Sequence, residues 1–300
     1  MRFLPARLLL LLPLMLTLPA SAEHHGGGGG KHYEAIEVSE DLYMLIGRGG
    51  FLSGNLGMSV GEDAVVLIDG GMPPSLELLN KAITQITPEA PDFLINTHIH
   101  GDHIGNNTVF AESGAHIVSH HTLRSRLLEQ GLNDQPADPA SLPVITFAEE
   151  MMFHLNGAPA RIIHTPAAHT DGDAMVAFPK VNVVFAGDLF FHGLFPFIDL
   201  DNGGSVDGFI AAQEQILAMV NDDTKIVPGH GELASATDLK RDLTMLKDAR
   251  ALVAGLIAAD HDIDAILAAN PLAKYHDDYN WGFITTERMT RTIYRDITGM

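Results

Sequence analysis

The chain contains no cysteine in its 300 residues. It therefore forms no disulfide and has no cysteine for lipid attachment, so its core alone must hold the fold together. Hydrophobic residues make up 46% of the sequence, and glycine and proline are scattered along it. This composition is typical of a globular protein, and a chain of this length can bury a sizeable core.

Basic residues are scarce, with 18 Lys and Arg against 38 Asp and Glu and a net charge of −20. Arg2 and Arg7 lie in the first segment, and without them 16 basic residues remain and the net charge is −22. Such a charge repels phosphate backbones and excludes both nucleic-acid substrates and polybasic membrane attachment. The expected partner is a small-molecule substrate, and the oligomeric state stays open.

The sequence also lacks an apolar run long enough to span a membrane. The run Leu8–Leu18 is 11 residues long, contains Pro13, follows two arginines and precedes the small residues Ala20–Ala22. This layout predicts a secretory signal peptide over residues 1–22, cleaved after Ala22. We therefore expect a periplasmic or secreted protein with no stable membrane anchor after cleavage.

Residues 23–32 contain five consecutive glycines and predict a flexible tether. From residue 33 to residue 300 no composition change marks a linker, so we expect one domain. Short β-type runs with turn signals alternate with helical segments in both halves, and the last 65 residues or so are predominantly helical. This order predicts an α/β fold in which two sheets carry helices on their outer faces, followed by C-terminal helices.

Four potential metal donors lie within the stretch NTHIHGDHIGN, directly after an apolar strand. His98 and His100 are two residues apart and can point to one side, while Asp102 and His103 follow a glycine turn. Four donors around one tight loop do not fit one ion comfortably, but they suit two ions side by side. A catalytic zinc also keeps one position open for water, so further ligands must come from elsewhere.

Three further donors each follow a β-type run beside glycine: His169, Asp188 and His230. Asp188 is the natural bridge, because a carboxylate can give one oxygen to each ion. The sequence thus predicts one ion on His98, His100 and His169, and a second on Asp102, His103 and His230. Zinc is the expected metal, two ions per chain, with iron or manganese as alternatives.

The motifs THIHGDH, HTDGD, FAGD and PGHG, in this order and spacing, resemble the metallo-β-lactamase superfamily of hydrolases. The resemblance runs from about Leu42 to Leu233. It implies a four-layer αββα sandwich with a dinuclear site at one edge of the sheets, and the same ligand roles. It also implies that Asp69, at a strand end in VVLIDGG, supports the site through a ligand, although a turn residue is an alternative.

Two features of the sequence exclude some subgroups of this superfamily. Lactamases of the clinical type generally carry Cys where Asp188 stands, whereas hydroxyacylglutathione hydrolases, lactonases and many exported relatives carry Asp. Flavo-diiron relatives replace the second histidine with Glu, and His100 argues against them. Persulfide dioxygenases use a single iron, and the complete second ligand set argues against these too.

The expected function is therefore that of an exported dinuclear zinc hydrolase that cleaves an amide or ester with water activated by the metals. A β-lactam or other cyclic amide is the first substrate class. A lactonase, a thioesterase and a non-catalytic zinc-binding protein remain alternatives. Asp102 is a candidate catalytic residue that orients the nucleophile, and His192, four residues after Asp188, is a second candidate that faces the substrate.

Two apolar segments are candidates for substrate contact. Phe51 and Leu52 lie in the glycine-rich stretch GRGGFLSGN and are expected to form an exposed tip above the metals. Phe191 and Phe195 lie in LFFHGLFPF and are expected to form an apolar wall of the cleft. Structural packing against neighbouring loops is the alternative for both segments.

Overall fold

A computed structural model describes residues 30–132 and 135–300 of the chain. The predicted signal peptide and residues 23–29 of the predicted tether lie outside this range. The tether was predicted to reach residue 32, but the first strand already begins at His32, which pairs with Arg48. None of the helices in the described ranges is both long and apolar enough to cross a membrane.

The first half of the chain builds a seven-stranded mixed sheet in the order β1 to β7. Hairpins connect β1 to β4 in antiparallel pairs, and β4 to β7 run parallel because helices connect them. Its strands are β1 His32–Ser39, β2 Leu42–Arg48, β3 Leu56–Val60, β4 Val65–Ile68, β5 Phe93–Ile95, β6 His116–His120 and β7 Ile145–Phe147. The edge strand β7 is only three residues long.

The second half builds a five-stranded sheet in the order β12-β11-β10-β9-β8. Strands β8 to β11 pair antiparallel, and β12 returns parallel to β11 after a helix. Its strands are β8 Glu150–Phe153, β9 Ala160–His164, β10 Ala174–Phe178, β11 Val183–Phe191 and β12 Lys225–His230.

Nine α-helices of the described residues connect or follow these strands. They are α1 Leu76–Ile86, α2 Gly101–Ile104, α3 Asn107–Glu112, α4 His121–Gln130, α5 Val206–Met219, α6 Ala236–Ala258, α7 Ile263–Ala269, α8 His276–Tyr279 and α9 Thr286–Thr298. The long helix α6 begins with a capping box in which Ser235 and Asp238 satisfy each other's backbone N–H groups.

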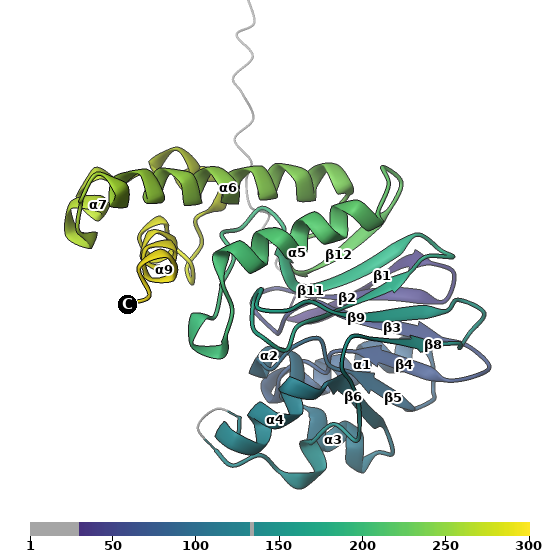
Figure 1. The fold of residues 1–300 in the computed structure, drawn as a ribbon. Coiled ribbons are helices and arrows are strands. Elements are labelled where there is room, and N and C mark those ends of the chain that lie inside the picture. The colour runs from purple at the N-terminus through teal and green to yellow at the C-terminus, as the bar shows by residue number, and fades with distance from the viewer. Residues whose placement is uncertain (1–29, 133–134) are drawn as a thin grey trace, which may run out of the picture.

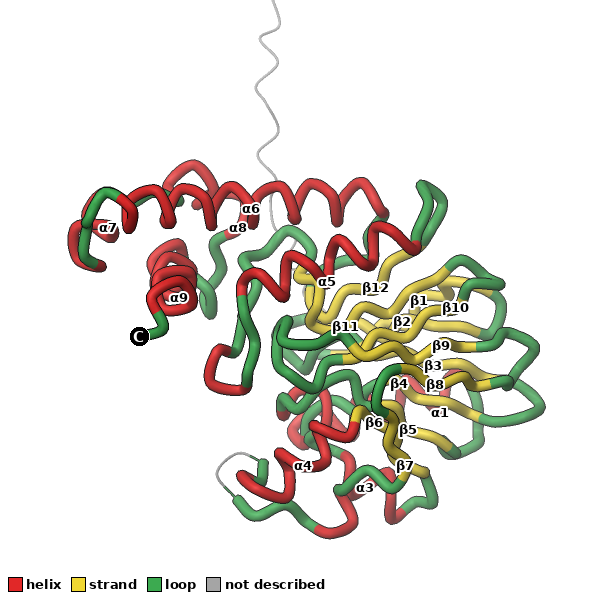
Figure 2. Tube along the Cα trace, in the orientation of Figure 1, coloured by secondary structure: helices red, strands yellow, loops and turns green. Residues whose placement is uncertain are grey.

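The two sheets pack face to face, as Figures 1 and 2 show, and their facing side chains form one apolar layer. Met44 and Ile68 of the first sheet and Val176 and Phe185 of the second belong to this layer and are at most 2% exposed. Alternation along each strand places such residues on the inner face and others on the outer face.

Helices cover the outer faces of both sheets. Leu79 and Ile83 of α1 pack on the first sheet, and Ala212 and Ile216 of α5 pack on the second. The predicted four-layer αββα sandwich is therefore confirmed.

The C-terminal helices form a separate apolar cluster beside the second sheet. Leu246 of α6, Ile266 of α7 and Ile293 of α9 are each at most 1% exposed and pack with Phe195 from the segment after β11. The predominantly helical character predicted for the last part of the chain is confirmed. This cluster fixes the segment between α8 and α9 beside the edge at which the metal-ligand candidates lie.

Candidate metal centre

The first four ligand candidates lie at the carboxyl end of β5, where neighbouring parallel strands also end. His98 and His100 follow the strand in an extended loop, and Asp102 and His103 lie in the short helix α2. His98 and His103 are buried, whereas His100 and Asp102 keep 20% of their side-chain surface exposed. Solvent therefore reaches the centre from one side.

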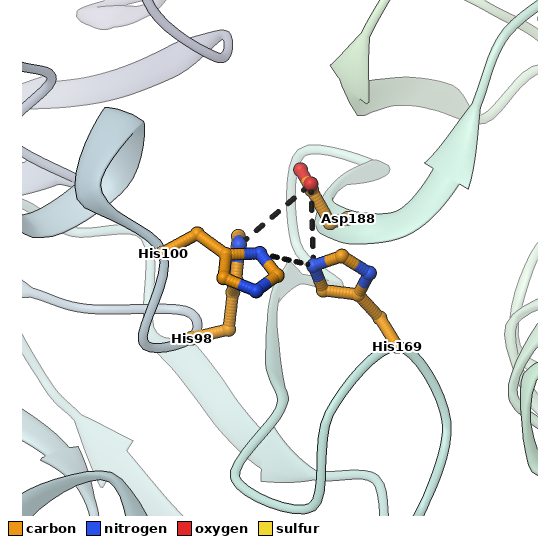
Figure 3. A group of neighbouring side chains, drawn as sticks. All are labelled: His98, His100, His169 and Asp188. Carbon is orange, nitrogen blue, oxygen red and sulfur yellow. Dashed lines mark hydrogen bonds and ion pairs between the residues drawn. The ribbon is translucent and has the colours of Figure 1, made fainter. Parts of the chain in front are cut away.

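The second sheet contributes the other three candidates. His169 lies in the loop between β9 and β10, Asp188 lies within β11, and His230 ends β12. Figure 3 shows His98, His100 and His169 converging with Asp188, although they come from segments far apart in the sequence. Two sheet edges thus meet at one group of side chains.

The candidates fall into the two groups that the sequence predicted. In each group one ligand atom per residue lies within 4.8 Å of all the others, and the groups are His98, His100, His169, Asp188 and Asp102, His103, His230. Asp188 lies between them: Oδ1 is 3.1 Å from His103 Nε2, and Oδ2 is 3.4 Å from His169 Nε2. Its carboxylate therefore faces both groups, as a bridging ligand must.

Hydrogen bonds on the far side of the rings fix the histidine tautomers. His103 Nδ1 donates to Asp69 at 2.8 Å, and His169 Nδ1 donates to the carbonyl of Phe197 at 2.8 Å. His100 Nε2 donates to Asp199 at 2.8 Å. In each ring the other nitrogen then faces the centre, where a neutral imidazole would offer its lone pair to a metal.

The facing nitrogens fit a cation between them. His169 Nε2 and His100 Nδ1 are 2.8 Å apart, and both are acceptors in the tautomers just described. His98 Nε2, His103 Nε2 and Asp188 Oδ1 are buried without a hydrogen-bond partner among the described residues. Buried polar atoms are costly when they lack a partner, so this set of nitrogen and oxygen donors fits a pair of divalent ions.

Electrostatics place the first group in the protonation state of metal ligands. Burial opposes ionisation of Asp188, but His103 and His230 outweigh it and hold its pKa well below the ordinary value. Burial lowers the pKa of His98 well below the ordinary value and lowers that of His169 to about 4. At pH 7 the carboxylate is charged and these two imidazoles are neutral.

The second group attracts positive charge. Burial lowers the pKa of His230, but Asp188 and Asp102 outweigh this effect and raise it to about 9. The same carboxylates raise the pKa of His103 well above its ordinary value against the effect of burial. A site that favours extra protons on its histidines also favours a bound cation.

Two glycines let the backbone approach the ligands. A side chain at Gly54 would overlap the ring of His103, and one at Gly229 would overlap Oδ1 of Asp188. Gly229 belongs to the PGHG motif. Gly54 lies in the segment after β2, and no sequence motif marked it as a neighbour of His103.

A family model described as the metallo-beta-lactamase superfamily matches residues 49–252 of this chain. The chain belongs to this superfamily. The matched region contains all seven ligand candidates and both sheets of the sandwich except β1 and β2.

Curated relatives and solved structures agree with this membership. The chain is 27% identical over 138 residues to a hydroxyacylglutathione hydrolase of Nitrosococcus oceani, covering 46% of this chain and 47% of that protein. It is 29% identical over 143 residues to a hydroxyacylglutathione hydrolase of Polaromonas sp., with the same coverage of each chain. The chain thus spans about half the length of the curated relatives it matches.

Among solved structures, a metallo-beta-lactamase from Pontibacter korlensis is similar with a TM-score of 0.60 and 18% identity, covering 72% of this chain and 100% of that one. The DIM-1 metallo-beta-lactamase is similar with a TM-score of 0.59 and 17% identity, covering 73% of this chain and 98% of that one. These likenesses concern the fold alone.

In this superfamily member Asp69 contacts the ligand group as the sequence predicted. It follows β4 with a φ of 61°, a left-handed conformation that is uncommon for a non-glycine residue. Its carboxylate accepts hydrogen bonds from the backbone N–H and the hydroxyl of Thr97 and from His103 Nδ1. Asp69 therefore orients the ring of His103.

Asp199 has the corresponding position beside His100 and was missed by the sequence analysis. It lies in the segment after β11, and Asn202 donates to its carboxylate through both its backbone and its side-chain amide. Asn202 in turn accepts from Arg126 of α4 at 3.0 Å. Because no local motif surrounds Asp199, only the fold brings it to His100.

Two of the predicted substrate residues lie elsewhere than expected. Leu52 was expected to be exposed beside Phe51, but it is only 5% exposed and packs in the cluster beneath the first sheet. Phe195 is fully buried among the C-terminal helices, so it does not line the cleft. In both cases the backbone turns the side chain inward, which the glycine-rich or aromatic composition did not reveal.

The other two aromatic candidates lie beside the centre. Phe51 is 59% exposed, and its ring centroid is 6.1 Å from that of His230. Phe191 is buried, and its ring stacks on that of His230 at 5.0 Å and lies tilted 6.0 Å from that of His169.

His192, a predicted catalytic residue, turns away from the ligand group. Its Nδ1 lies 2.8 Å from the carbonyl oxygen of Glu232, and its Nε2 lies 3.7 Å from Asp238. Both ring nitrogens thus face the segment that begins α6. The catalytic role predicted for His192 gains no support from this position.

The burial of Leu52 predicts different effects of two neighbouring substitutions. Leu52→Ala should lower the free energy of unfolding by about 2–4 kcal/mol, because it opens a cavity in a packed cluster. Phe51→Ala should leave stability nearly unchanged, since most of its side chain already contacts solvent. Denaturant unfolding of both variants beside wild type measures the difference, and equal stability of the two variants would contradict this placement.

Asp199 provides a second prediction. Asp199→Asn should weaken zinc binding by about 10- to 100-fold, because a neutral amide oxygen accepts the hydrogen bond from His100 Nε2–H less strongly than a carboxylate does. Competition against a chromogenic chelator measures the affinity directly. Asp201→Asn is the matched control: its side chain is 79% exposed and pairs with Arg295. Equal zinc affinity in both variants would show that Asp199 does not position His100.

Proposed function

We propose that this chain is an exported hydrolase that binds two zinc ions and cleaves an amide or ester bond, with β-lactams and other cyclic amides as the first substrate class. The observation that carries the proposal is the pair of donor groups that Asp188 faces with both oxygens. His98, His100 and His169 would hold one ion, Asp102, His103 and His230 the other, and Asp188 both.

Two bound zinc ions supply a water molecule that is acidic near neutral pH and a Lewis acid for a carbonyl oxygen. The protein's part is to fix seven ligands and to keep one side open. Asp102 is suited to orient water, because its Oδ2 lies 3.4 Å from His230 Nε2 and its side chain is 20% exposed. The ionised carboxylate can accept a hydrogen bond from a water that approaches along the open side.

Aromatic side chains beside the ligands exclude water and favour an apolar substrate. Phe197 stacks on His100 with ring centroids 5.4 Å apart, and Phe51 stacks on His230 at 6.1 Å. A reacting carbonyl between such rings lies in a region of low polarity, where charge interactions strengthen.

A thioester is the second candidate substrate, and the curated relatives favour it. The relatives from Nitrosococcus oceani and Polaromonas sp. are both named hydroxyacylglutathione hydrolase, and each matches about half of this chain. Export argues against glutathione thioesters, which are made inside the cell. A screen of zinc-loaded protein against β-lactams, lactones and thioesters separates these classes, and a chain that turns over none of them would be an exported zinc-binding protein instead.

The dinuclear assignment makes a prediction about zinc content. Protein purified without chelator and loaded with zinc should contain two ions per chain by elemental analysis, since each donor group is complete on its own. Iron or manganese can replace zinc according to availability, because these donors bind several metals. A constant value of one ion after loading would contradict the second site.

Replacement of the bridging residue should disrupt both sites. Asp188→Ala should lower kcat/KM at least about 100-fold and reduce the bound zinc, because the carboxylate lies within 3.6 Å of four of the other ligand candidates, two in each group. Metal content and a thermal melt are measured on the same variant, because they distinguish loss of the ions from loss of the fold. Unchanged kinetics and zinc content would show that Asp188 does not bridge.

A further inference from the structure

The segment between α8 and α9 forms one wall of the approach to the metal centre. The ring centroid of Trp281 lies 6.2 Å from that of His230 and 6.4 Å from that of Phe191. The ring of Phe283 lies 5.6 Å from Trp281 and 5.3 Å from Phe197, which itself stacks on His100. The C-terminal helices therefore place Trp281 next to a ligand candidate of the second donor group, and Phe283 next to the ring that stacks on His100 of the first.

This wall is partly open to solvent. Phe283 is 47% exposed, and Phe51, whose ring stacks on that of His230, is 59% exposed. Exposed aromatic side chains beside a polar centre are typical of ligand-binding clefts, whereas a soluble protein ordinarily buries such rings.

Arg288 of α9 adds a positive charge to this wall. Its guanidinium carbon lies 4.2 Å from the ring centroid of Phe283 and 5.3 Å from that of Phe197. One N–H group donates to the carbonyl oxygen of Phe283 at 3.1 Å. Stacking on two rings holds the planar guanidinium in a fixed orientation.

Arg288 has no carboxylate within ion-pair distance in the described ranges, which is unusual in this acidic chain of 38 Asp and Glu. Its neighbours on the same helix are paired, Arg291 with Glu287 at 2.9 Å and Arg295 with Asp201 at 2.9 Å. Of the other arginines in those ranges, only Arg124 also lacks an acidic partner, and it donates to the carbonyl oxygen of Pro143 instead. The charge of Arg288 is therefore available to a ligand.

We propose that Arg288, Phe283 and Trp281 form a substrate subsite, in which Arg288 binds a carboxylate and the two rings bind an apolar or aromatic group. This inference deepens the proposed function by naming the substrate class: an acyl compound with both an apolar group and a carboxylate. The ring of Phe197 lies 5.3 Å from the guanidinium carbon and 5.4 Å from the ring of His100, so a substrate held by Arg288 would lie beside the metal centre. A guanidinium has the planar N–H geometry that pairs with a carboxylate.

The single tryptophan of the chain, Trp281, allows binding to be measured without turnover. Zinc-loaded protein is titrated with 3-phenylpropionate and with its neutral counterpart 3-phenylpropionamide, and the fluorescence of Trp281 is recorded. Wild type should bind the carboxylate about three- to tenfold more tightly than the amide. Arg288→Gln should abolish this preference and leave amide binding unchanged. Arg291→Gln, the matched control on the same helix, should keep it.

Two results would overturn the subsite. An undiminished preference in Arg288→Gln would mean that the carboxylate binds elsewhere, at the metals for instance. No change of Trp281 fluorescence with either compound would mean that the aromatic wall does not bind ligand.

Hydrolysis assays on the same samples test the proposed function separately. Mono-4-nitrophenyl glutarate and 4-nitrophenyl pentanoate are esters that differ mainly by the terminal carboxylate. If the subsite exists, Arg288→Gln raises KM for the glutarate ester alone and leaves kcat near the wild-type value. Carboxylate preference in the titration without hydrolysis of any acyl substrate would refute the proposed hydrolase while leaving the subsite in place.

Discussion

The buried carboxylate of Asp188 is the constraint on which the two sheets depend. An ionised group taken out of water costs roughly several kcal/mol unless opposite charge and hydrogen bonds offset the loss. Asp188 is 4% exposed, and its oxygens face imidazole nitrogens of His98, His103, His169 and His230 at 3.1–3.6 Å. Because these rings come from the first sheet as well as the second, the charge of Asp188 is compensated only when the edges of both sheets meet. The same contact between the sheet edges assembles the candidate metal centre.

The ligand group was predictable from the sequence because each part of it is a local pattern. THIHGDH, HTDGD, FAGD and PGHG each place a donor beside glycine at the end of a β-type run, and strand ends gather at one edge of a parallel sheet. Most strands were predictable for the same reason, since alternation of apolar residues and turn signals act over a few residues. The three-residue strand β7, Ile145–Phe147, is too short to show an alternation of its own, and pairing with β6 is what makes it a strand.

The residues that support or surround the ligands could not be predicted, because their roles are set by tertiary contacts. Asp199 reaches His100 across 99 residues of sequence and is held there by Asn202. Leu52 follows the exposed Phe51 directly, yet it is buried, because adjacent residues of an extended segment point to opposite sides. Both residues are large and apolar, so the sequence predicted the same exposure for both. Only the backbone conformation shows that one side chain points outward and the other inward. Export and the number of bound ions remain predictions of the sequence.

The proposed substrate contacts and the ligand candidates come from different parts of the chain. All seven ligand candidates lie between residues 98 and 230, whereas Trp281, Phe283 and Arg288 belong to a segment fixed by the cluster of α6, α7 and α9. That cluster packs through Phe195 and Ile198 on the segment after β11, which also carries Phe197 and Asp199. Shifts in this packing would move the aromatic wall and the partner of His100 together. The buried Phe195, which the sequence suggested as a substrate contact, instead packs the segment after β11 against these helices.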